Sequence, residues 1–132
     1  MSVARFLEFP LLSETEIMVA NEKGLNVRMA SSVQDVMNCQ RLRYEVFALE
    51  MGAQLPTGHL GLDKDGFDDV CAHLLVEDMA TGDIVACTRI LTDKVAQEVG
   101  GYYYSDHEFD LTKIRQMSGR VMEIGRTCVR AD

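Results

Sequence analysis

Apolar residues recur at helical spacing between residues 33 and 51, which is the clearest pattern in the chain. Ser31 and Ser32 precede this segment as capping residues, Asp35 falls in its first turn, and Gly52 follows it. The pattern therefore predicts a helix over 33–51. The apolar stripe of this helix consists of Val33, Val36, Met37, Cys39, Leu42, Val46, Phe47 and Leu49.

Four shorter segments have the character of strands. The first alternates apolar and polar residues in part, the next two form a hairpin around the turn Ala80-Thr81-Gly82-Asp83, and the last follows Gly119. These predicted strands are residues 25–30, 71–77, 84–91 and 120–129. A long loop over 52–69, rich in Gly, Asp, Pro and His, and a short helix over 110–115 complete the order. We therefore predict an α/β fold, a mostly antiparallel sheet of about four strands with the long helix on one face.

The 132 residues suit one domain, and 47% of them are apolar, as in soluble globular proteins. No apolar run approaches the roughly 20 residues of a membrane-spanning helix, and residues 1–16 lack the features of a secretory signal. The formal charge of −8 argues against nonspecific nucleic-acid binding. Residues 111–130 nevertheless contain five basic side chains and one acidic side chain, Glu123. This end could bind an anionic ligand or an acidic partner, or it could be a solvated surface.

The four cysteines are far apart and form no CxxC pair, so we predict free buried thiols in a cytoplasmic protein and no metal site. The spacing of Cys71 and His73 would place both on one face of a strand and is only a weak indication of metal binding. In the acidic run 63–69, Gly66 does not bring the ligand positions of an EF-hand into register. The run can be a solvated turn or a site that holds a cation such as an amino group.

Three charged residues stand inside otherwise apolar strands. Arg89 needs a partner there, either a loop aspartate or the carboxylate or phosphate of a substrate. Glu123 and Arg126 would face opposite sides of a regular strand, but a bulge at Gly125 could turn both toward one site. A carboxylate in this setting can act as a general base.

Considered together, the order and spacing of these residues resemble the pattern of a known family. Arg43 and Phe47 on the helix, Asp65 and Asp68 in the loop, Arg89, and Glu123 with Arg126 have the order and spacing found in acyl-homoserine lactone synthases, which are GNAT-like acyltransferases. The surrounding sequence is similar to bacterial ornithine N-acyltransferases of ornithine-lipid synthesis, often labelled hemolysin-like. That similarity is carried by Arg41-Leu-Arg-Tyr-Glu-Val-Phe47, Glu50-Met-Gly52, Asp65-Gly-Phe-Asp-Asp69, His73-Leu-Leu-Val76, Arg89-Ile-Leu91, Tyr104-Ser-x-x-Glu-Phe109 and Glu123-Ile-Gly-Arg126.

The resemblance implies a GNAT-like fold and transfer of a 3-hydroxyacyl group from acyl carrier protein to the α-amino group of ornithine. It implies that no cofactor is bound and that the donor is a phosphopantetheine thioester. Glu123 would be the base or the amine anchor, and Phe47 would shape the acyl pocket. Asp65 and Asp68 would hold the cationic amino acid. Arg43, Arg89 and Arg126 would hold its carboxylate or the pantetheine phosphate, or would fix the loop through salt bridges to Asp65 or Asp68.

The domain plan that follows is an N-terminal arm over 1–24 and the N-terminal half of a GNAT-like domain over 25–132. GNAT domains place a thioester-cradling turn and helix after the last strand predicted here, so we expect a fragment that could be inactive by itself. Two alternatives stay open. One is an acyl-homoserine lactone synthase, although the chain has no Trp after Glu50-Met51; the other is a noncatalytic half-domain that completes a sheet with a partner. We expect a cytoplasmic protein, with peripheral association at the inner membrane left open.

Overall fold

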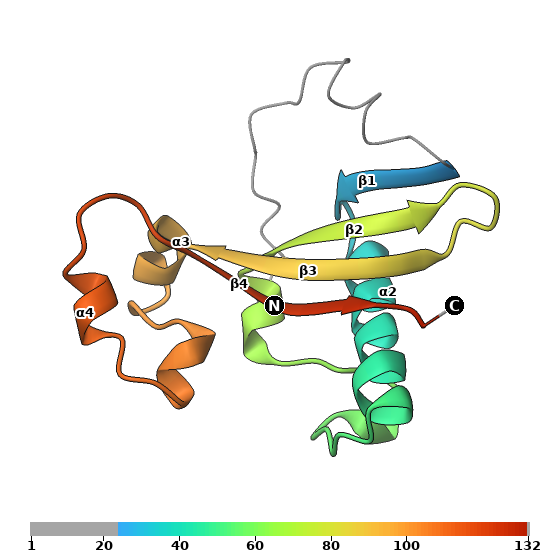
Figure 1. Ribbon diagram of the computed structural model, residues 1–132, viewed down its shortest axis with the longest axis horizontal. Coiled ribbons are helices and arrows are strands. Elements are labelled where there is room, and N and C mark those ends of the chain that lie inside the picture. Colours follow the sequence, from blue (N-terminus) through green and yellow to red (C-terminus); the bar gives the residue numbers. More distant parts are fainter. Residues whose placement is uncertain (1–23, 132) are drawn as a thin grey trace.

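The computed structural model describes residues 24–131, and its centre is a sheet of four antiparallel strands (Figure 1). The strands are β1 (Leu25–Met29), β2 (Ala72–Asp78), β3 (Ile84–Thr92) and β4 (Met122–Val129), and they pair in that order. The predicted antiparallel sheet of about four strands is thus confirmed. The predicted N-terminal arm, except for Gly24, lies outside the described residues.

The long helix α2 (Val33–Tyr44) begins where the sequence predicts. The Ser32 hydroxyl accepts a hydrogen bond from the Asp35 backbone N–H at 3.1 Å, as a capping residue does. The Asp35 carboxylate then binds the Arg28 guanidinium at 2.8 and 2.9 Å. Because Arg28 lies on β1, this pair ties the start of the helix to the edge strand.

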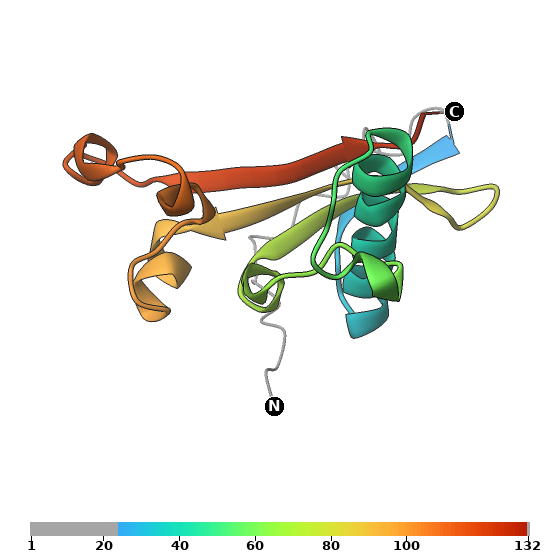
Figure 2. The same cartoon turned by 90° about the horizontal axis from the view of Figure 1, so that it is seen from below.

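The core lies between α2 and one face of the sheet. In Figure 2, α2 and the segment that follows it lie in front of the strands. Cys39 and Leu42 of the helix pack with Leu75, Cys87 and Cys128 of the three strands β2 to β4. The cysteines are free and buried, and they act here as small apolar side chains.

The long helix ends differently from the predicted helix over 33–51. The α-helical winding stops at Tyr44, and η2 (Glu45–Glu50) continues as a π-helix, with the Met51 N–H bonded to the Val46 carbonyl. Apolar spacing cannot distinguish the two windings over so few residues. Such π segments are rare and occur often at functional sites, and this one carries Phe47.

The loop after the helix contains two short 3₁₀ turns, η3 (Gly58–Leu60) and η4 (Gly66–Asp69). Beyond β3 the chain forms three further short helices: α3 (Asp93–Glu98), η5 (Tyr104–His107) and α4 (Thr112–Arg115). Figures 1 and 2 place α3 and α4 at the end of the β3–β4 pair that is remote from α2. Helix α3 is absent from the elements predicted from the sequence, although the Thr92 hydroxyl caps it by accepting from the Val95 N–H. Among the described residues, no helix is long and apolar enough to cross a membrane.

Candidate functional site

A buried cluster of alternating charges joins the long helix, the loop and the third strand. Arg43 donates to the two carboxylate oxygens of Asp68 at 2.9 and 2.7 Å, and both side chains are 1% exposed. Arg89 also reaches Asp68, at 3.0 Å, and binds both oxygens of Asp65 at 2.6 and 2.9 Å. The salt bridges that were one predicted role of Arg43 and Arg89 are therefore present, and they attach the loop to the helix and the third strand.

Asp63 extends this cluster to the fourth strand. Its carboxylate accepts from Arg43 at 2.8 Å and from the Nε of Arg126 at 2.9 Å, and a second Arg126 nitrogen also contacts it. Arg126 thus pairs with Asp63 and not with Asp65 or Asp68. The Arg126 guanidinium also lies 4.4 Å from the centre of the Phe47 ring, which is a cation–π contact with the π-helical segment.

A bulge in β4 explains how Arg126 and Glu123 come to one face. Gly125 pairs with Arg89 and Cys128 pairs with Cys87, so two residues of β4 face one residue of β3. Arg126 adopts a φ of 51°, the only positive φ of a non-glycine residue in the described range. The bulge predicted at Gly125 is confirmed, and it turns Arg126 toward the side of the sheet that carries α2.

Asp68 is held as a carboxylate despite its burial. Burial alone would raise the pKa of this carboxyl, but the hydrogen bonds and charge of Arg43, and then the charge of Arg89, outweigh it and keep the pKa below its usual value. Further donors complete the shell: the Gln40 amide at 3.1 Å and the Asp65 N–H at 3.2 Å. The cluster is therefore a satisfied, rigid unit.

His73 closes the cluster on the side of β2. Its Nε2 lies 3.0 Å from the Asp68 backbone carbonyl, and the ring is buried. Burial lowers the pKa of His73 below its ordinary value, so the ring is neutral beside the two arginines at neutral pH. Within residues 24–131, no group of three or more His, Cys, Asp or Glu side chains is arranged to hold a metal ion.

Glu123 lies beside this cluster without an ion pair to it. Its carboxylate accepts the backbone N–H groups of Tyr104 and Ser105, at 2.8 and 2.9 Å. These bonds attach the first turn of η5 to β4. Glu123, Arg89 and Tyr104 line a common cavity of about 50 Å³.

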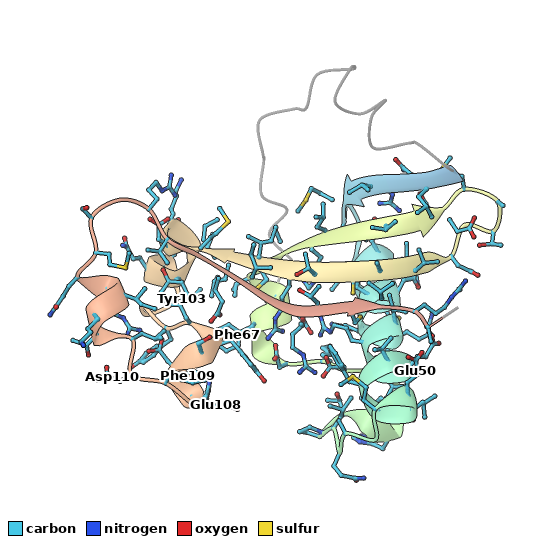
Figure 3. All side chains as sticks on the ribbon, viewed as in Figure 1. Glu50, Phe67, Tyr103, Glu108, Phe109 and Asp110 are labelled. Carbon is cyan, nitrogen blue, oxygen red and sulfur yellow. The ribbon has the colours of Figure 1, made fainter. Side chains whose placement is uncertain are left out.

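A second, larger cavity of about 600 Å³ opens on the other side of Tyr104. It lies between η4 and the segment that runs from the end of α3 through η5. In Figure 3, Phe67 lies on the η4 side of this region, and Tyr103 and Glu108 lie on the opposite segment. Asp65 lines this cavity too, so the salt-bridge cluster forms part of its wall.

The structure thus gathers the predicted site residues in one region, in two groups. Arg43, Phe47, Asp65, Asp68, Arg89 and Arg126 are linked through ion pairs and ring contacts, while Glu123 stands at the neighbouring small cavity. Asp63, which links Arg43 to Arg126, is absent from the site residues predicted from the sequence. Its place in the acidic run 63–69 was the only signal, and it does not distinguish Asp63 from its neighbours.

Residues 42–132 match the sequence family described as the acetyltransferase (GNAT) domain. The chain belongs to the GNAT family. It is 36% identical to L-ornithine N(alpha)-acyltransferase of Rhodobacter capsulatus over 87% of its own length and 47% of that protein. It is 40% identical to the protein of the same name from Rhizobium meliloti, over 80% of this chain and 38% of the relative.

The Brucella abortus protein of that name is 35% identical over 83% of this chain and 42% of the relative. The chain therefore spans less than half the length of these relatives. Among solved structures, the acyl-homoserine lactone synthase LasI superposes with a TM-score of 0.57 and 16% identity, over 82% of this chain and 54% of LasI. That likeness supports the GNAT fold predicted from the sequence.

Proposed function

We propose that this chain is part of an enzyme that transfers an acyl group to the α-amino group of ornithine. The observation that carries the proposal is the identity of 35–40% to relatives named L-ornithine N(alpha)-acyltransferase, over 80–87% of this chain. The blocks that resemble that family in the sequence include the charged residues of the cluster except Asp63, and part of the lining of both cavities. The donor in this proposal is a 3-hydroxyacyl thioester of acyl carrier protein.

In the proposed reaction the amine nitrogen attacks the thioester carbonyl carbon. The new C–N bond forms an amide, the C–S bond breaks, and the thiol of the donor leaves. The attacking amine must first lose a proton, because an ammonium group has no free electron pair. Glu123 is the proposed acceptor of that proton, since its carboxylate is fixed by two N–H donors at a small cavity.

The remaining site residues take three proposed roles. Arg43 and Asp68 are buried and fully engaged within the cluster, so they are proposed as positioning residues that hold the loop against α2. Asp65 and Arg89 line the cavities, where they are proposed to contact the amino-acid substrate. Arg126 and Phe47 face each other at the end of the bulge, where the proposed ligand is the acyl group or the pantetheine phosphate.

The test is a reconstituted transfer assay with the 132-residue chain. If the reading frame continues beyond residue 132, the longer protein is assayed as well. Ornithine is incubated with a 3-hydroxyacyl thioester of either acyl carrier protein or coenzyme A, and products are identified by mass spectrometry. The proposal predicts N-acylornithine, formed faster from the carrier protein. Absence of this product with both donors and both proteins, or formation of an acyl-homoserine lactone in its place, would overturn it.

A further inference from the structure

The cavity of about 600 Å³ between η4 and η5 has walls suited to a cation. The rings of Phe67, Tyr104 and His107 lie 5.7 to 6.0 Å apart, centre to centre, in edge-on and tilted arrangements. Tyr102, which is 65% exposed, adds a further ring to the lining. Aromatic faces attract ammonium and guanidinium groups. Two of these rings already hold one cation, because the Arg89 guanidinium lies 5.0 Å from the Tyr104 centre and 5.7 Å from that of Phe67.

The charges of this cavity have one sign. Its lining includes Asp65 and Glu108 and contains no Lys or Arg. Asp65 is engaged by Arg89 through both carboxylate oxygens. Glu108 is exposed, and within residues 24–131 its carboxylate makes no hydrogen bond or ion pair. The lining therefore has one carboxylate available for a positively charged ligand.

Tyr104 connects this cavity with the proposed base. It lines both cavities, and its own N–H binds the Glu123 carboxylate at 2.8 Å. Tyr104 therefore forms part of the wall of both cavities. Ornithine carries two amino groups separated by the α-carbon and three methylene groups, so its ends can address two neighbouring sites.

We propose that the large cavity binds the side-chain ammonium group of a diamino acid, through the Glu108 carboxylate and the faces of Tyr102 and Tyr104. The α-amino group of the same molecule then faces Glu123. This inference rests on the proposed function and adds the feature that selects a diamino acid over a neutral one. An acyl chain is the competing occupant, and Glu108 argues against it because a carboxylate is costly to bury against hydrocarbon.

The test measures binding to the 132-residue chain by titration calorimetry, with ornithine and with norvaline, which has the same carbon chain but no side-chain amine. We expect ornithine to bind roughly tenfold more tightly, since one ammonium contact of this kind is worth about one power of ten. Glu108→Gln should remove most of that preference. Glu50→Gln is the matched control, because Glu50 is an exposed acid on η2, far from Glu108 in Figure 3, and it should leave the preference unchanged.

Equal affinity for the two amino acids, no measurable binding of ornithine, or a preference that survives Glu108→Gln would overturn the inference. Displacement of ornithine by 3-hydroxydecanoate in wild type but not in Tyr102→Leu would assign the cavity to the acyl chain and would also overturn it. The proposed function fails separately. A preference for ornithine that depends on Glu108, without any N-acylornithine in the transfer assay, would retain the ammonium site and exclude the reaction.

Discussion

Arg43 and Asp68 form a two-bond ion pair across 25 residues of sequence, with donor–acceptor distances of 2.9 and 2.7 Å and both side chains 1% exposed. Arg43 comes from the long helix and Asp68 from η4, so the pair attaches the loop to the helix. The same carboxylate accepts from Arg89 of β3. One aspartate thereby sets the relative positions of helix, loop and sheet beneath both cavities.

Arg43→Met should destabilise the fold by about 3–5 kcal/mol, because it leaves the buried Asp68 and Asp63 carboxylates without their main partner. Arg43→Lys should recover only part of the loss, since an ammonium cannot reproduce the two-bond geometry. Urea unfolding followed by circular dichroism measures both. Arg41→Met, an exposed position on the same helix, is the control and should cost less than about 1 kcal/mol. A loss at Arg43 no larger than that at Arg41 would show that the pair does not hold the loop.

Arg126 should show two opposing effects, the loss of its ion pair with Asp63 and the relief of its positive φ. Arg126→Ala loses the ion pair and keeps the unfavourable backbone, whereas Arg126→Gly loses both. The Gly variant should therefore be more stable than the Ala variant by about 1 kcal/mol in thermal or urea unfolding.

The order of stability should reverse at the next residue. Thr127 has no positive φ, so Thr127→Gly should be less stable than Thr127→Ala. If Gly is the less stable choice at both positions, the conformation of the bulge differs from the one described.

His73 should make the fold sensitive to mild acid. In the unfolded chain it titrates near 6.5, and in the folded chain burial lowers its pKa. Below 6.5 the unfolded state therefore binds a proton that the folded state does not, so the free energy of unfolding decreases as the pH falls. The contribution of His73 is fully present above that pH and changes by at most about 1.4 kcal/mol per pH unit below it.

Urea unfolding at several pH values between 7.5 and 5, values chosen to span the ordinary histidine range, measures this dependence. His73→Gln should flatten the profile, and His59→Gln, at an exposed position, should leave it as in wild type. An unchanged slope in His73→Gln would mean that His73 is not the group that titrates.

The sequence predicts those parts of the fold that depend on local patterns. Ser32 as the cap, the bulge next to Gly125 and most of the apolar stripe of the long helix are visible in short stretches of sequence, and the structure has them. Val33 and Leu49, at the two ends of the predicted stripe, are exposed instead. The π-helical turn around Phe47 is not visible in this way, because apolar spacing over six residues fits both windings.

The pairing within the site is predicted less completely. Charged residues inside apolar strands are predicted to form ion pairs. Which of the four loop carboxylates pairs with each arginine depends on how the loop folds. Asp63 meets Arg126 across 63 residues of sequence, and the Tyr104 N–H meets Glu123 across 19. Such contacts are set by the sheet and the bulge, not by local spacing.

The central claim is that Glu123 takes the proton from the attacking amine, and the kinetics of Glu123→Gln test it most directly. The variant is made in the 132-residue chain and, if the reading frame continues beyond residue 132, in the longer protein. The amide keeps the size of the side chain and one acceptor oxygen for the Tyr104 or Ser105 N–H, but it cannot take a proton from the amine. We predict that kcat for ornithine acylation falls by roughly 10²–10⁴-fold while the KM for the acyl donor and the melting temperature change little. A folded variant with wild-type kcat would contradict the account, as would a variant in which only the KM for ornithine rises or only the melting temperature falls.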